Sequence, residues 1–232
     1  MADAPPSFDT HTLRDQRHVV VRRVLAAADL DTLRTVLANR SSGAGKGGRR
    51  HVEREAAGIE APARTGTGMA LAREALGPQA HFVRGIYFDK SPQNNGDVTW
   101  HQDRTIAVEK RASIPSWGPR SRKDGRWHVQ PPIDWLERMI AVRLHLDDAG
   151  ERSGGLRPIA GSHRNGLLAT RRIADLVHEL PPRCPSLCAG DALLMHPLLL
   201  HALSRIETPC HRRVLHCEYC ALTLPEGLNW AT

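Results

Sequence analysis

The segment VTWHQDRTIAV, residues 98–108, carries a histidine and an aspartate two positions apart among largely apolar residues. If the segment is a β-strand, its two-residue period turns His101 and Asp103 toward one face and Gln102 toward the other. An imidazole nitrogen and a carboxylate oxygen are both ligands of divalent transition metals. This spacing is weak evidence by itself, because most histidines on strands are structural, so a metal site requires further residues.

The C-terminal part of the chain supplies four histidines that could complete such a site: His196, His201, His211 and His216. Two histidines and one carboxylate on one face of an octahedral Fe(II) leave three positions open, which suits a bidentate 2-oxo acid followed by dioxygen. An oxygenase of this type also needs a buried cation for the far carboxylate of its 2-oxo acid. Arginine suits this role because its planar fork pairs with a carboxylate through two hydrogen bonds.

The elements that would position these residues are mainly strands. The chain has 232 residues, of which 41% are hydrophobic and 25% charged, and this fits one globular domain. From residue 80 onward, short apolar runs alternate with turns, a pattern typical of a β-sandwich or barrel. The runs cover residues 81–88, 98–108, 139–147, 155–161, 191–197, 198–206 and 212–224.

Residues 1–79 read as a helical flank to this β core. We expect a strand over 18–25, an amphipathic helix over 29–40 and a short helix over 68–77. The loop between the helices contains GAGKGG, residues 43–48. It lacks the preceding strand and the Gly-Lys-Ser/Thr element of a phosphate-binding loop, so we interpret it as a plain loop. The prediction is one domain over residues 1–232.

Five motifs, in this order along the chain, resemble the phytanoyl-CoA dioxygenase family of Fe(II)- and 2-oxoglutarate-dependent oxygenases: TWHQD, RLHLDD, GGLRPIAGSHRNG, GDALLMHPLLLH and HRRVLHCEY. The resemblance runs from about His81 to Trp230. It implies a mainly β protein with flanking helices and the double-stranded β-helix (jelly-roll, cupin-like) fold. It also implies an enzyme that uses Fe(II), 2-oxoglutarate and O2 to hydroxylate an unactivated C–H bond of a small molecule, such as an amino acid, an acyl compound or a natural-product intermediate, with release of succinate and CO2.

The same resemblance, followed position by position, implies roles for individual residues. His101 and Asp103 match the first two iron ligands of the family, and His201 matches its distal histidine. Arg212, eleven residues after His201, matches the arginine that binds the C5 carboxylate of 2-oxoglutarate. Lys90 also matches a family position, and we place it with the co-substrate ligands.

Two of these assignments have rivals in the sequence. His196 could be the distal ligand instead of His201, and five residues between them put the two on opposite faces of a continuous strand. The spacing to Arg212 favours His201 within the family pattern. Arg213 is the alternative to Arg212, because a shift of one residue turns a side chain to the other face.

Other residues are candidates for contacts with the co-substrate or the substrate. Arg143 lies on a strand face that we expect to look into the barrel, and it is a further candidate for the co-substrate site. Segment 109–138 is polar, bounded by prolines and long enough to be a lid-like insertion. Its candidate substrate contacts are Trp117, Trp127 and His128.

Two positions affect what the resemblance implies about co-substrate binding and about the type of reaction. Many family members have a small hydroxyl residue two places after the distal histidine, where it helps to bind the co-substrate. Here that position is Leu203, with Ser204 next to it. Related halogenases replace the aspartate ligand by a small residue so that chloride can bind iron. Because Asp103 is a carboxylate, we do not expect halogenation.

Charge and cysteine content exclude some classes of function. The net charge of +7 comes from 28 arginines and four lysines, and the arginines are scattered rather than grouped with aromatic residues, which does not favour nucleic acid binding. A basic cavity mouth would suit an anionic small substrate. Five cysteines without a secretion signal argue against a disulfide framework. The CEYC motif lies on an expected strand, which favours packed thiols over a zinc site.

The expected setting is cytoplasmic, because the N-terminus lacks a signal-peptide pattern and no apolar run approaches a membrane span. We expect a small-molecule substrate, no membrane partner and a monomer or homodimer. One alternative is a non-catalytic jelly roll or sensor that binds metal or 2-oxoglutarate without decarboxylating it. Another is a nucleic-acid or macromolecule-binding module, which would need a continuous arginine surface.

Overall fold

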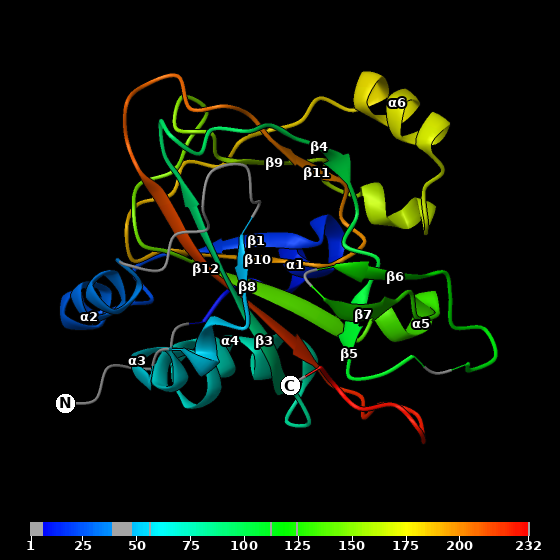
Figure 1. The fold of residues 1–232 in the computed structure, drawn as a ribbon. Coiled ribbons are helices and arrows are strands. Elements are labelled where there is room, and N and C mark those ends of the chain that lie inside the picture. The colour runs from blue at the N-terminus through cyan, green and yellow to red at the C-terminus, as the bar shows by residue number, and fades with distance from the viewer. Residues whose placement is uncertain (1–6, 39–47, 56, 112, 124, 232) are drawn as a thin grey trace.

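The strands form three antiparallel sheets in the computed structural model, which describes residues 7–38, 48–55, 57–111, 113–123 and 125–231 (Figure 1). The largest sheet has the order β1-β10-β8-β12-β3-β2, formed by His18–Val21, Ala192–Met195, Met139–His145, Arg212–Cys220, His81–Lys90 and Arg49–Arg50. A second sheet has the order β4-β11-β9, formed by Val98–His101, His201–Leu203 and Leu156–Pro158. A third has the order β5-β7-β6, formed by Ile106–Val108, Arg126–Val129 and Arg120–Lys123.

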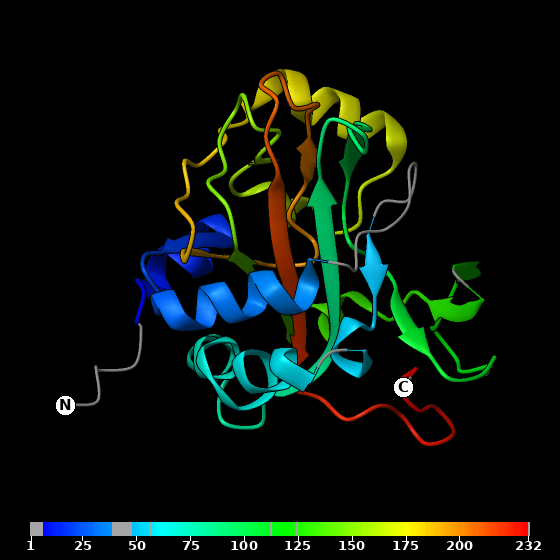
Figure 2. The ribbon, with the colours of Figure 1, turned by 60° about the vertical axis from the view of Figure 1, so that its left-hand side comes forward.

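Helices cover the outer face of the large sheet (Figures 1 and 2). The helices before the jelly roll are α1 Thr10–Gln16, α2 Ala27–Leu37, α3 Ala57–Glu60 and α4 Thr67–Leu76, with a 3-10 turn at Val52–Arg54 and a π turn at Ala61–Thr65. Leu33 of α2, Leu71 of α4 and Tyr219 of β12 are buried in the same apolar core. Later in the chain come α5 Ile133–Leu136, a 3-10 turn at Ser162–Asn165 and α6 Thr170–Glu179.

Strand alternation gives the large sheet two different faces. On β12, Leu215, Cys217 and Tyr219 pack into the core beneath the helices. The alternate residues Arg212 and His216 line a cavity on the other face. Because successive strand residues point to opposite sides, one strand builds the core and the cavity wall together. Among the described residues, no helix combines the length and the apolar character needed to cross a membrane.

The predicted mainly β jelly roll with flanking helices is confirmed, but several element boundaries differ. The predicted strand over 98–108 is wrong as one element, because residues 102–105 separate β4 from β5. The predicted strand over 18–25 ends at Val21. Most of GAGKGG lies outside the described residues, and the stretch after it contains short helical turns as well as loop. Segment 109–138 contains β6, β7 and α5 in addition to irregular chain.

Candidate metal centre

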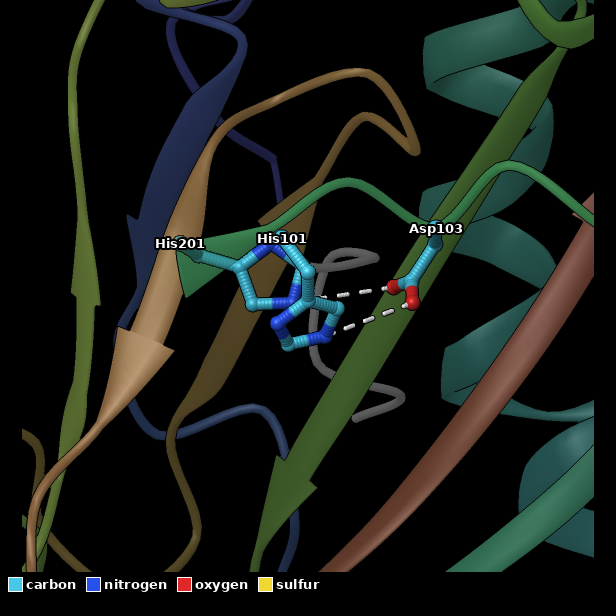
Figure 3. Close-up of side chains that lie close together, drawn as sticks. All are labelled: His101, Asp103 and His201. Atoms are coloured by element: carbon cyan, nitrogen blue, oxygen red, sulfur yellow. Dashed lines mark ion pairs between the residues drawn. The ribbon is translucent and has the colours of Figure 1, made fainter. Parts of the chain in front are cut away.

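His101, Asp103 and His201 offer one ligand atom each within 4.8 Å of one another (Figure 3). The Nε2 atom of His101 lies 3.8 Å from Asp103 Oδ1, and Nε2 of His201 lies 3.7 Å from Asp103 Oδ2. Figure 3 shows both rings beside the carboxylate, and their ring centroids are 4.3 Å apart. These separations exceed hydrogen-bonding distance, so the three donor groups do not satisfy one another.

Pairing of β4 with β11 places the two histidines directly opposite each other. The Nδ1 atom of His101 is 2.7 Å from the Thr99 carbonyl oxygen, and Nδ1 of His201 is 2.9 Å from that of Leu199. A carbonyl only accepts, so each Nδ1 carries the hydrogen and each Nε2 keeps a lone pair. Burial lowers the pKa of His201 to about 4, which keeps its ring neutral at pH 7. Both Nε2 atoms are therefore prepared as metal ligands.

Asp103 reaches the histidines from a turn and not from a strand. Strand β4 ends at His101, and the chain then bends at the buried Gln102. The backbone N–H of Asp103 donates to the Pro197 carbonyl at 2.8 Å, which fixes the turn against the chain before His201. Burial alone would raise the pKa of Asp103, but the two nearby histidines lower it by a larger amount. The net shift is downward, so the carboxylate is ionised.

The buried Gln102 side chain holds this turn, a role that the sequence did not reveal. Its Nε2 donates to the carbonyls of Gly166 and Leu198, both at 2.8 Å, and its Oε1 accepts from the Leu168 N–H at 2.9 Å. All three hydrogen bonds are made to backbone groups, which have few other hydrogen-bond partners available in a buried site. Gln102 therefore ties the ligand turn to two other segments.

We expect Gln102→Ala to lower the free energy of unfolding by about 2–4 kcal/mol, because it removes three buried hydrogen bonds and leaves their backbone partners unsatisfied. Urea unfolding followed by circular dichroism measures the change. Gln79→Ala, at an exposed position, is the matched control and should stay within about 0.5 kcal/mol of the wild type. Equal stability of the two variants would mean that Gln102 does not support the turn.

The three donors lie on the wall of a cavity of about 620 Å³. The cavity also contacts Lys90, Arg143, Arg212 and His128, which the sequence singled out. This one cavity therefore brings together residues from β3, β7, β8 and β12 with the candidate ligands from β4, from the segment after β4 and from β11. The arrangement can hold a metal and a small anionic ligand side by side.

Arg212 is the clearest candidate for an anion ligand in this cavity. It is 2% exposed, and its Nε and Nη1 atoms have no hydrogen-bond partner in the described part of the chain. Burial lowers the pKa of Arg212 to about 10, so the side chain remains cationic. Lys90 lies opposite it on β3 and donates to the Ser204 carbonyl. Burial, and then the charge of Arg212, lower the pKa of Lys90 to about 8.

The two alternative residues, Arg213 and His196, have partners away from the three donors. Arg213 faces away from the cavity and binds Asp147 through Nε at 2.8 Å and Nη2 at 2.7 Å. His196 is buried, accepts from the Leu198 N–H at 3.2 Å, and has its Nε2 3.5 Å from a carboxylate oxygen of Glu137. Neither residue belongs to the group of three donors.

The sequence matches the family described as Phytanoyl-CoA dioxygenase (PhyH) over residues 13–214. The chain belongs to this family. No curated protein matches the sequence. The phytanoyl-CoA dioxygenase assignment agrees with the order of the motifs and with the histidine and aspartate donors at the cavity.

Solved structures share the fold of this phytanoyl-CoA dioxygenase family member at low sequence identity. EctD from S. alaskensis, solved with bound Fe, has a TM-score of 0.71 and 16% identity, covering 95% of this chain and 78% of its own. SnoK, a non-haem alpha-ketoglutarate-dependent carbocyclase from nogalamycin biosynthesis, has a TM-score of 0.69 and 17% identity, covering 91% and 82%. HygX from Streptomyces hygroscopicus, solved with nickel and 2-oxoglutarate, has a TM-score of 0.65 and 15% identity, covering 93% and 88%.

A polar chain along the cavity wall of this phytanoyl-CoA dioxygenase family member includes residues that sequence reasoning missed. The Nη1 atom of Arg143 donates to His216 Nδ1 at 2.8 Å, and His216 Nε2 lies 3.6 Å from Glu218. Arg84 binds Glu218 through Nε at 2.7 Å and Nη2 at 2.8 Å. Burial raises the pKa of Glu218, but Arg84 and His216 outweigh it and hold that pKa well below its usual range. The sequence had offered His216 only as a possible metal ligand, and alternation along β12 from Arg212 was the signal that could have placed it and Glu218 on this wall.

The three residues expected on the lid differ in position. His128 lines the cavity, whereas the two tryptophans are not among the lining residues. Trp117 is buried and packs edge-on against Trp135, with ring centroids 5.4 Å apart. Trp127 alternates with His128 along β7 and lies under the guanidinium of Arg122, 5.2 Å from the ring centre. The tryptophans therefore stabilise the insertion and do not reach the cavity.

Proposed function

We propose that this phytanoyl-CoA dioxygenase family member is an Fe(II)- and 2-oxoglutarate-dependent oxygenase that hydroxylates an unactivated C–H bond of a small molecule and releases succinate and CO2. The observation that carries the proposal is a three-donor group and a buried arginine without a partner, both on one cavity. Packing explains neither feature, because each leaves polar atoms unsatisfied in the protein alone. A divalent metal and a dianionic co-substrate would satisfy both.

The donor set fits Fe(II). His101 and His201 would each bind it through a neutral Nε2, and the ionised Asp103 would complete the set of two nitrogen ligands and one carboxylate. Fe(II) bound with 2-oxoglutarate supplies the activation of O2 that C–H oxidation requires. The protein holds the candidate ligands close together before the metal binds, which would position the reacting groups for the reaction.

Arg212 and Lys90 fit the far carboxylate of 2-oxoglutarate. Arg212 offers buried donors that have no other partner in the described residues, and its planar fork suits a carboxylate. Leu203, which stands where a hydroxyl residue is frequent in the family, lines the cavity without offering a donor. Arg143 lies on the same cavity, with its Nη1 engaged by His216, and serves as a further positive charge. The co-substrate charge would offset the cost of burying these cations.

We expect anaerobic addition of Fe(II) and 2-oxoglutarate to give a visible metal-to-ligand charge-transfer band, which should be absent with Fe(II) alone. Admission of O2 should then release succinate and CO2 in equal amounts, at a rate that the right substrate increases. Absorption spectroscopy and succinate analysis measure the two steps. Absence of the band in folded protein would contradict the proposal. A band without succinate across a substrate screen would instead favour a 2-oxoglutarate sensor.

A further inference from the structure

A second group of cations lies at the end of the cavity away from Arg212. Strands β3 and β12 pair along their length, so Arg212 lies opposite Lys90 and Glu218 lies opposite Arg84. Arg84 and Lys90 are six residues apart on β3, which is about 20 Å along an extended strand. Both ends line the same cavity. A ligand held by Arg212 therefore leaves the Arg84 end without a negatively charged ligand.

Arg84 keeps one unsatisfied donor at this end. The side chain is 6% exposed and uses Nε and Nη2 to bind the Glu218 carboxylate. Its Nη1 is buried and has no hydrogen-bond partner within the described ranges. The ion pair holds the guanidinium in place beside the cavity that Arg84 lines.

The β5-β7-β6 sheet contributes two more donors on the facing wall. In the β6–β7 pair, Ser121 lies opposite His128 and Lys123 lies opposite Arg126. Because paired residues and every second residue of a strand share a face, Lys123 and His128 lie on the same face. His128 is 2% exposed, and neither ring nitrogen has a partner among the described residues. Burial, and then the charge of Arg84 and of Lys123, lower the pKa of His128 to about 4. The neutral ring therefore offers one N–H donor.

Lys123 stands at the rim, where its Nζ donates to the Thr105 hydroxyl at 3.2 Å. Lys123, Arg84 and His128 line the same cavity. In keeping with this, partial burial and then the positive charges of Arg50 and Arg84 lower the pKa of Lys123. Arg84, His128 and Lys123 therefore offer three nitrogen donors to a ligand at this end of the cavity.

The charge balance of the cavity leads to the same conclusion. Among the described residues, seven arginine and lysine residues line it, against four aspartate and glutamate residues. One Fe(II) and one 2-oxoglutarate dianion would cancel each other, so basic side chains would still outnumber acidic ones on the described wall after both had bound. Glu218 already neutralises Arg84, which favours a carboxylate with a single charge over a dianionic phosphate at this end.

We propose that the substrate carries a carboxylate, which Arg84, His128 and Lys123 bind at the end of the cavity opposite Arg212. This inference rests on the proposed oxygenase function and specifies its substrate class. The subsite and the candidate metal ligands line the same cavity, so a substrate held by its carboxylate would extend along the cavity toward the metal.

The test is a binding measurement that needs no turnover. The wild-type protein is loaded with Zn(II) and 2-oxoglutarate, and ¹⁹F NMR measures its affinity for 4,4,4-trifluorobutanoate, 4-fluorophenylacetate and 4-fluorophenylbutanoate, each beside its primary amide. We expect at least one acid to bind tenfold or more tightly than its amide. Lys123→Glu should remove this preference, because it reverses one charge at the subsite. Lys110→Glu, the same substitution at an exposed residue that does not line the cavity, should keep it.

A second pair of variants tests the hydrogen bond from the imidazole. His128→Ala should weaken binding of the same acid by at least fivefold, and His128→Gln, which retains an N–H donor, should recover part of the loss. Calorimetric titration of 2-oxoglutarate into the same proteins, loaded with Zn(II) alone, separates the two proposals. Wild-type protein that fails to bind 2-oxoglutarate would contradict the oxygenase function itself. Normal 2-oxoglutarate binding with no acid preferred over its amide, or with equal effects of Lys123→Glu and Lys110→Glu, would overturn the carboxylate subsite alone.

Discussion

Replacing His201 by alanine is expected to weaken Fe(II) binding at least 100-fold, whereas replacing His196 by alanine should leave it within about threefold of the wild type. His201 presents a neutral Nε2 to Asp103 across from His101, so its loss removes one of the three proposed metal ligands. His196 belongs to a separate cluster beside Glu137. Anaerobic calorimetry with Fe(II), supported by metal analysis after gel filtration, measures the difference.

The His196 variant is an informative control because it is equally drastic in volume and equally buried. It removes the acceptor of the Leu198 N–H, so we expect a loss of about 1–3 kcal/mol in the free energy of unfolding without loss of metal. His201→Ala should show the opposite pattern, with a larger effect on the metal than on the ligand-free fold. Loss of Fe(II) binding by a folded His196→Ala protein would show that the metal is bound elsewhere than at the group in Figure 3.

The sequence predicted the three donor residues that the structure brings together, although one step of that prediction was wrong. Strand alternation was expected to turn His101 and Asp103 to one face, yet β4 ends at His101 and Asp103 lies in a turn. The turn brings the carboxylate to the same side because Gln102 is anchored to three distant backbone groups. Those anchors come from segments more than 60 residues away in sequence, and local periodicity carries no information about them.

The alternation of side chains along a strand predicted their directions correctly where the strand is long and paired on both sides. On β12, which lies between β8 and β3, it correctly separates Arg212 from Arg213 and extends to His216. It could not show that Glu218 meets Arg84, because that pairing depends on the register between strands 134 residues apart. Likewise, local pattern could not show that Trp127 faces away from the cavity, which depends on the β6–β7 pairing, or that Trp117 packs against Trp135.

Replacing Arg212 by leucine is expected to weaken 2-oxoglutarate binding at least 100-fold and to leave Fe(II) binding unchanged. The charged group that would pair with the far carboxylate is lost, and removal of one partner from a buried charged hydrogen bond costs about 2–5 kcal/mol. The same variant should unfold at an equal or higher urea concentration when no ligand is present. In the ligand-free protein, Arg212 is a buried cation whose Nε and Nη1 lack partners in the described chain, so an apolar replacement removes a desolvation cost.

Arg213→Leu should give the crossed result. Its guanidinium is bound to Asp147 on the opposite face of β12, so we expect a loss of about 1 kcal/mol in stability and no change in 2-oxoglutarate affinity. Calorimetric titration of 2-oxoglutarate into the Fe(II)-loaded proteins, beside urea unfolding of the ligand-free proteins, measures both quantities. If Arg212 were kept because it stabilises the fold, Arg212→Leu would rank below Arg213→Leu both in 2-oxoglutarate affinity and in stability. If Arg212→Leu is the weaker binder but the more stable protein, Arg212 is kept at a cost to the ligand-free protein because its partner arrives with the co-substrate.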